Sequence, residues 1–247
     1  MTHANGQQGT QQDELQNGEV PRLHHFALDP FCRRVRLALN ELGVAHELVE
    51  ERPWLREERL LALNPSGEVP VLVAPDGTAV AGIYAVAEYI EEQWATPETS
   101  LLGSTAAQRA EVRRLLSHFD GRFFMEVSGP VLMEKGVKRL LPREMGGGAP
   151  DTAALRTALS KLDTHLALIG QLAEERGLLA GAALTLADLA AAAHLSVLEY
   201  LDALRFNGQE AAKIWYQRIK SRPSFRPLLA DRVRGLTPPA IYAALDF

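Results

Sequence analysis

One cysteine lies where a thiol could be reactive. Cys32 follows Asp29, Pro30 and Phe31, and Asp before Pro is typical of a helix N-terminus, since the carboxylate caps the helix and proline fits its first turn. Unpaired N–H groups there lower the pKa of a nearby thiol, which favours redox or nucleophilic chemistry. The carboxylate of Asp29 opposes this, because it would repel a thiolate. We favour a packed core thiol for Cys32, with a redox role as the alternative.

Other side chains that could do chemistry are better explained by structure. His24 and His25 lie on an apolar segment without a visible carboxylate partner, so packing or solvation is favoured over catalysis. His194 lies in an Ala-rich segment and is interpreted as a hydrogen-bonded core histidine. Asp188 follows Thr185 by three residues, as in a helix capping box. We therefore assign no catalytic residue and no metal ligand.

The composition is that of an ordinary globular protein. The 247 residues are 47% hydrophobic and 23% charged, with a formal net charge of −5, which argues against nucleic acid as the main partner. A single cysteine excludes a disulfide framework and fits a reducing compartment. The most apolar stretch, 178–204, is interrupted by charged residues, so we expect no membrane span. These features predict a cytoplasmic protein.

The first 20 residues are polar and contain five glutamines. They have neither the positive start nor the apolar stretch of a signal peptide. We predict a disordered tail over residues 1–20, or alternatively a start codon placed too early, with Val20 as the first residue. In both interpretations the fold begins near Pro21.

Residues 21–96 have the pattern of a small α/β domain. Short apolar segments alternate with helical ones, Gly43 closes the first helix, and Asp76-Gly77 is a typical hairpin turn. The predicted order is strand, helix, strand, helix, strand, strand, helix. The predicted segments are 23–28, 30–42, 44–49, 56–63, 69–73, 78–81 and 83–94.

Residues 105–232 are predicted to form an all-helical domain after a polar linker over 97–104. Apolar residues recur at spacings of three and four in this part of the chain. Ser128-Gly129-Pro130 is expected to interrupt the first helix. Gly and Pro residues in the tail over 233–247 disfavour a continuation of the helix. The fold class is therefore α/β plus all-α.

Three motifs together resemble the glutathione transferase superfamily over about residues 22–231. They are the segments 29–36, 64–72 and 184–188. The resemblance implies a thioredoxin-like N-terminal domain, a helical C-terminal domain, a homodimer and a cis peptide bond between Val69 and Pro70. A cis proline would turn the backbone of Val69 toward a peptide-like ligand.

The resemblance also implies a glutathione cleft, which we expect to be vestigial. The residues at its positions are Asp29, Phe31, Cys32, Arg33, Val69, Pro70, Gly82 and Ile83. Relatives hold the γ-glutamyl end of glutathione with an acidic residue and a serine, where this chain has Gly82 and Ile83, and Asp29 takes the place of the first cysteine of the redox relatives. A polar ligand group left unpaired costs about 1–3 kcal/mol. We expect no cofactor and weak or absent glutathione binding; a glutathione-dependent transferase or thiol reductase is the alternative.

The C-terminal third resembles a branch of the superfamily made of bacterial cell-division factors, through segments 211–216, 220–232 and 242–247. That branch implies a non-catalytic dimer at midcell that binds filaments of the tubulin-like GTPase FtsZ. It would curve or bundle them and couple them to septal wall synthesis, which the C-terminal tail could contact. A stress-response scaffold that binds another protein through the same cleft remains open.

Six residues are candidates for binding a partner. They are Trp54, Arg222, Arg226, Asp231, Asp246 and Phe247. Trp54 lies in a charged stretch, and an exposed tryptophan there would be an interaction anchor. The arginines have an alternative as a solvated face with intrachain salt bridges. The tail has an alternative as a segment packed on the helical domain.

Overall fold

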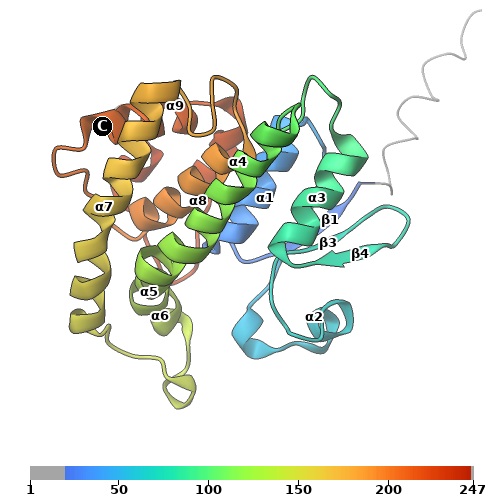
Figure 1. Ribbon diagram of the computed structural model, residues 1–247. Helices are drawn as coiled ribbons and strands as arrows, with labels where there is room; N and C mark the ends of the chain where they lie inside the picture. The colour runs from blue at the N-terminus through green and yellow to red at the C-terminus, as the bar shows by residue number, and fades with distance from the viewer. Residues whose placement is uncertain (1–19, 246–247) are drawn as a thin grey trace, which may run out of the picture.

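A computed structural model describes residues 20–245 of the chain. The predicted disordered tail, up to residue 19, and the candidates Asp246 and Phe247 lie outside the described residues. The fold consists of a small α/β domain followed by a helical domain, as predicted (Figure 1). No helix in residues 20–245 is long and apolar enough to cross a membrane.

The α/β domain contains a four-stranded mixed sheet in the order β2-β1-β3-β4. β1 pairs in parallel with β2 and antiparallel with β3, and β3 pairs antiparallel with β4. The predicted element order is confirmed. The elements are β1 (Arg22–His25), α1 (Pro30–Glu41), β2 (Glu47–Glu50), α2 (Glu58–Leu63), β3 (Val71–Val73), β4 (Ala79–Ala81) and α3 (Ile83–Trp94).

The strands are shorter than predicted because turns extend into the apolar runs. Val44 was predicted to begin the second strand, but its N–H donates to the carbonyl of Leu39 at 2.9 Å and so completes the end of α1. Gly43 has φ +69°, which allows this reversal. Likewise β1 ends at His25, since the N–H of Asp29 donates to the carbonyl of Phe26 and closes a turn there.

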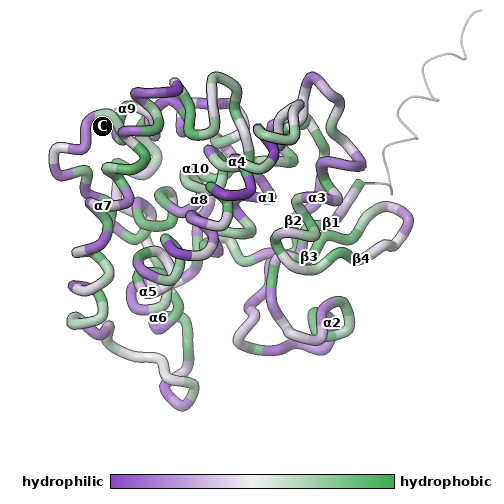
Figure 2. Tube along the Cα trace, in the orientation of Figure 1, coloured by the Kyte–Doolittle hydropathy of each residue, from purple (hydrophilic) through white to green (hydrophobic). Residues whose placement is uncertain are grey.

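The sheet and two helices enclose the first core. Leu23 and Leu72 from the sheet pack with Val35 and Leu39 of α1 and with Val86 of α3. Figure 2 shows β3 and β4 mainly in green, the colour of hydrophobic residues. A strand that is apolar on both faces is typical of a sheet covered by helices.

The helical domain begins with one long helical run that passes through the predicted interruption. Ser128-Gly129-Pro130 does not break it; this prediction was wrong. The segments Ser117–Ser128 and Leu132–Val137 on either side are π-helical. Proline lacks an N–H, and the wider turn tolerates this loss while the N–H of Gly129 donates to the carbonyl of Phe124. The run consists of these two segments with α4 (Ala106–Leu116), α5 (Gly129–Val131) and α6 (Lys138–Leu140).

The remaining helices surround a central one. Every residue of α8 (Leu186–Tyr200) is buried, and its four consecutive alanines allow close packing. α1 of the first domain packs directly against α8, so the two domains share one apolar core. The others are α7 (Thr152–Arg176), α9 (Glu210–Lys220) and α10 (Arg226–Leu229).

Two connecting segments are more firmly packed than their polarity suggests. The linker over 97–104 buries Leu101 and Leu102, and the N–H of Leu186 donates to the carbonyl of Leu101 at 2.9 Å. The tail contains a short 3₁₀ helix, Ala240–Ala243, in which Tyr242 is fully buried. For the described part of the tail, the alternative of packing on the helical domain is therefore correct.

Candidate functional site

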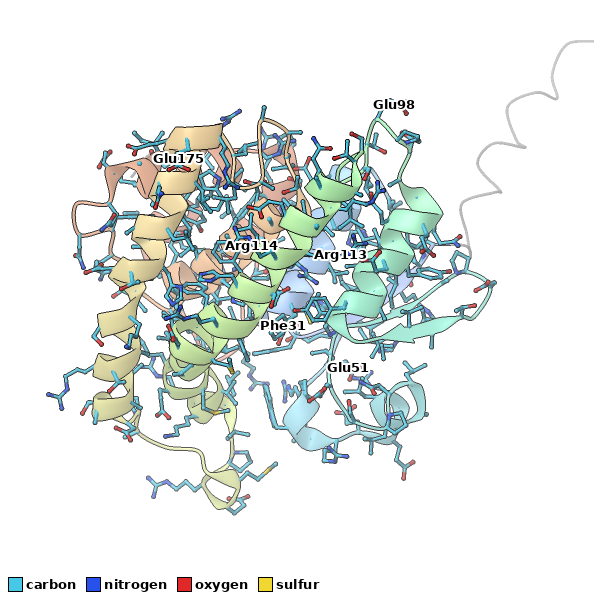
Figure 3. All side chains as sticks on the ribbon, viewed as in Figure 1. Phe31, Glu51, Glu98, Arg113, Arg114 and Glu175 are labelled. Carbon is cyan, nitrogen blue, oxygen red and sulfur yellow. The ribbon has the colours of Figure 1, made fainter. Side chains whose placement is uncertain are left out.

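A cleft of about 530 Å³ lies between the two domains. In Figure 3, Phe31 lies where the long helical run faces the α/β domain, at this cleft. Three parts of the α/β domain meet there: the start of α1, the segment before β3 and the start of α3. The lining residues are Asp29, Phe31, Pro53, Glu68, Val69, Pro70, Gly82, Ile83, Tyr84, Ala85 and Phe124.

Two features of the backbone shape the cleft. The Val69–Pro70 bond is cis, as the resemblance implied. Gly82, at the N-cap of α3, has φ +89° and no side chain to offer. The first N–H groups of a helix have no partner within the helix, so the start of α3 presents donors to the cleft.

The side chains of the cleft do not suit glutathione. Asp29 and Glu68 are the charged side chains among the described residues that line it. Glutathione carries two carboxylates and one ammonium group, and the lining offers no cation to pair with a carboxylate. Ile83 stands at the first position of α3 and makes no hydrogen bond through its side chain. Gly82 and Ile83 therefore lie in the cleft as predicted, and their side chains cannot pair with a charged end of a ligand.

Asp29 acts as a helix cap. Its Oδ1 accepts the backbone N–H of Cys32 at 2.8 Å. Burial raises the pKa of Asp29 to about 6, although the hydrogen bonds at the cap oppose the rise. The carboxylate thus occupies the N–H of Cys32, and its negative charge would repel a ligand thiolate.

Cys32 and Arg33 do not line the cleft, which corrects their assignment to it. Cys32 is 0% exposed and points into the core; burial and the nearby carboxylate of Asp29 raise its pKa well above the ordinary value. Arg33 is directed between the domains, where it donates to the carbonyl of Ala27 at 2.8 Å and to Ser196 Oγ at 2.8 Å. Both side chains lie on the inner face of α1.

Cys32 is therefore expected to resist thiol reagents in the folded protein. Labelling by an aromatic disulfide reagent should be on the order of a hundredfold slower in buffer than in urea, since only a thiolate reached by local opening reacts. The measurement is the absorbance of the released thiolate over time. Equal rates in buffer and in urea would contradict the burial of this thiol and revive its redox role.

Two partner-binding candidates make ion pairs within the chain. Arg222 forms a bidentate ion pair with Glu41 at the end of α1. Its Nε lies 2.6 Å from Oε1 and its Nη2 lies 2.7 Å from Oε2 of that residue. Asp231 accepts two hydrogen bonds at 2.8 Å from Arg36 of α1. The Arg222–Glu41 pair is an intrachain salt bridge of the kind that the alternative interpretation gave for the arginines. Arg226 is exposed and stays a candidate.

Trp54 is half-buried rather than fully exposed. It packs edge-on against Phe26, with ring centroids 5.2 Å apart, and lines a second cavity of about 320 Å³. This cavity also includes three arginines from separate parts of the chain. Trp54 therefore stays a candidate for binding a partner.

Buried polar networks were not foreseen in the sequence. His24 Nδ1 lies 2.8 Å from Oε1 of Glu51, the residue that directly follows β2. His194 is a core histidine, as predicted: its Nδ1 lies 2.7 Å from Ser128 Oγ. Charged residues inside otherwise apolar helices were the feature of the sequence that could have indicated these networks, since buried charges need partners.

His25 is expected to make stability depend on pH. Burial and the positive charge of Arg36 lower the pKa of His25 from 6.5 to about 4, and its Nδ1 has no hydrogen-bond partner among residues 20–245. As the pH falls, His25 is protonated in the unfolded chain before it is protonated in the folded protein. The free energy of unfolding therefore decreases between pH 6.5 and about pH 4, the two pKa values of His25. From about pH 7 to pH 5 the loss from this residue is about 2 kcal/mol.

Urea unfolding of wild type and His25→Leu at both pH values measures this contribution. The difference in the free energy of unfolding between the two proteins should change in favour of His25→Leu at the lower pH. If this difference is the same at both pH values, the low pKa of His25 is contradicted. Other titrating groups are common to both proteins and cancel in the comparison.

Comparisons with known proteins agree with this geometry. Residues 30–93 match the family described as glutathione S-transferase, N-terminal domain. The chain is 47% identical over 228 residues to FtsZ-localized protein A of Caulobacter vibrioides, covering 91% of this chain and 97% of that protein.

Solved structures show the same fold. A glutathione S-transferase from Rhodospirillum rubrum superposes with a TM-score of 0.88 at 46% identity, covering 92% of this chain and all of that one. FzlA from C. crescentus superposes with a TM-score of 0.87 at 47% identity, with the same coverage. The identity and the shared fold extend over both domains, and the chain belongs to the glutathione S-transferase superfamily.

Proposed function

We propose that this protein is a dimeric, non-catalytic cell-division protein that binds FtsZ filaments at midcell. The observation that carries the proposal is a cleft that keeps the family's cis Val69–Pro70 bond but contributes carboxylates and no cation. The relationship to FtsZ-localized protein A supports it, because the identity of 47% covers nearly the whole of both chains. Together they favour a scaffold kept for interaction over one kept for glutathione chemistry.

A homodimer explains how such a protein could shape filaments. A two-fold dimer presents each binding surface twice, so one molecule can bridge two filaments or two points on one filament. Bridging of this kind bundles filaments or curves them. In the proposal, the end of the tail then couples the filament to septal wall synthesis.

Co-sedimentation with FtsZ polymerised in GTP tests the proposal, with GDP as the control. We expect GTP-dependent pelleting, and the Cys32→Ser variant should pellet equally well because this thiol is buried. Retention on immobilised glutathione should be weak. Absence of pelleting where FtsZ itself sediments, together with retention on glutathione, would overturn the proposal in favour of a glutathione-dependent transferase or thiol reductase.

A further inference from the structure

A second cavity lies where the two domains and the tail meet. It has a volume of about 320 Å³ and is separate from the cleft beside Pro70. The segment after β2, the α6 end of the long helical run and the tail each contribute one arginine. The lining residues, which we call the arginine pocket, are Phe26, Glu50, Arg52, Trp54, Arg139, Leu140, Val233, Arg234 and Gly235.

The arginine pocket has an excess of positive charge. Arg52, Arg139 and Arg234 are exposed, and none of their side chains makes a hydrogen bond or an ion pair within residues 20–245. Glu50 is the one carboxylate among the lining residues. Three positive charges against one negative charge contrast with the net charge of −5 of the whole chain. Unpaired guanidinium groups around one pocket are suited to bind carboxylates in the bidentate geometry that arginine prefers.

The same pocket has an apolar wall. Trp54 is held edge-on against the buried ring of Phe26 at 5.2 Å, and Leu140 and Val233 complete the wall. Tryptophan and arginine are the residues most enriched at energetic centres of protein interfaces. An occupant that satisfies this pocket therefore combines negative charge with an apolar side chain.

We propose that the arginine pocket binds a linear acidic segment of a partner protein, one that places an apolar side chain against Trp54. Charge complementarity with the three arginines favours an acidic occupant, and the apolar wall favours a peptide over a bare anion. Glu50, which also lines the pocket, disfavours densely charged polyanions. This inference does not require that the partner be FtsZ, so it stands apart from the proposed function.

A peptide titration of the full chain tests the proposal. The probe is a fluorescein-labelled peptide in which glutamate alternates with leucine, and binding is followed by fluorescence anisotropy. The double variant R139E/R234E should weaken binding by about tenfold or more, because attraction becomes repulsion at two of three sites. Glu50→Gln should tighten it by about threefold.

Matched controls separate this pocket from general attraction. The double variant R156E/K161E makes the same charge change on the exposed face of α7 and should leave binding unchanged. Peptides with glutamine in place of glutamate, or serine in place of leucine, should both bind more weakly. Equal binding by R139E/R234E and R156E/K161E, or by the glutamine and glutamate peptides, would overturn the proposal.

Small anions provide the last control. Competition by inorganic phosphate at the ionic strength of the buffer, or equal binding of the leucine and serine peptides, would reduce the pocket to an unspecific anion site and so overturn the proposal. Circular dichroism of each variant establishes that it is folded. The peptide assay contains no FtsZ. A negative result there therefore argues against the arginine pocket as a peptide site and says nothing about the proposed binding to FtsZ filaments.

Discussion

Replacement of Asp231 by asparagine is expected to destabilise the protein by about 3 to 5 kcal/mol, because it leaves buried positive charge without its counter-ion. Asp231 accepts two hydrogen bonds from Arg36 at 2.8 Å and lies 3.4 Å from Arg33. The side chains of Arg33 and Arg36 are 0% and 3% exposed. Neither guanidinium can lose its proton or reach bulk water, so the lost pairing is not replaced.

Urea unfolding of Asp231→Asn against wild type measures this loss. Asp202→Asn is the matched control: it removes a carboxylate from an ion pair with Arg205 whose side chains are 58% and 61% exposed. Exposed pairs of this kind contribute about 0–1 kcal/mol. Equal destabilisation by the two variants would contradict the view that Asp231 joins the α/β domain to the C-terminal part of the chain.

The tail is expected to loosen in the same variant. Tyr242 donates its hydroxyl hydrogen to the carbonyl of Leu228 at 2.7 Å and accepts a hydrogen bond from Arg33 at 3.0 Å. Arg33 therefore links α1, Asp231 and the tail in one buried group. A partner that contacts the tail would act on a segment that the α/β domain already holds in place.

The order of elements in the α/β domain could be predicted because its signals are local. Asp29-Pro30 marks the start of α1 and Asp76-Gly77 the hairpin, and each depends on residues a few positions apart. Strand ends were less accurate, because Val44 is apolar and β-branched but bonds to the end of α1. The continuous helical run through Pro130 was missed, since a π-helical register is a property of the folded backbone.

The long-range charge contacts could not be read from the sequence. Arg33 and Asp231 are 198 positions apart, and Arg222 and Glu41 are 181 apart. In the sequence Arg222 was interpreted as a partner-binding residue or a member of a solvated cluster, and Asp231 as a partner-binding residue, because nothing local shows that either side chain pairs with a distant residue of the same chain. Arg33 and Arg36 on an otherwise apolar helix were the signal that could have indicated a buried interdomain contact.

The cleft was predicted through resemblance, and its individual residues only in part. The resemblance placed Gly82, Ile83 and Pro70 correctly, because they belong to motifs next to fixed turns. It failed for Cys32 and Arg33, since successive positions on a helix face different directions. Asp29 and Phe31 face the cleft, and the next two side chains face the interior.

Replacement of Asp188 by alanine is expected to destabilise the protein by about 4 to 6 kcal/mol, from two unsatisfied buried donors and a lost helix cap. Its carboxylate accepts the N–H of Leu179 at 2.9 Å, the indole N–H of Trp215 at 3.2 Å, and both the N–H and the hydroxyl of Thr185. Burial raises the pKa of Asp188, and these hydrogen bonds oppose the rise. All of them lie at the start of the fully buried α8.

The comparison with a second cap isolates the effect of burial. Thr105 begins α4 in a capping box with Gln108, but it is exposed, so Thr105→Ala should cost about 1 kcal/mol. Asp188→Asn keeps one acceptor oxygen and should fall between the two alanine variants in urea unfolding. If Asp188→Ala cost no more than Thr105→Ala, the carboxylate would be only a local cap. If destabilisation instead increases from Thr105→Ala through Asp188→Asn to Asp188→Ala, the Asp188 carboxylate connects α8 to α9 and to the turn before α8. It then stabilises the position of the central helix in the shared core.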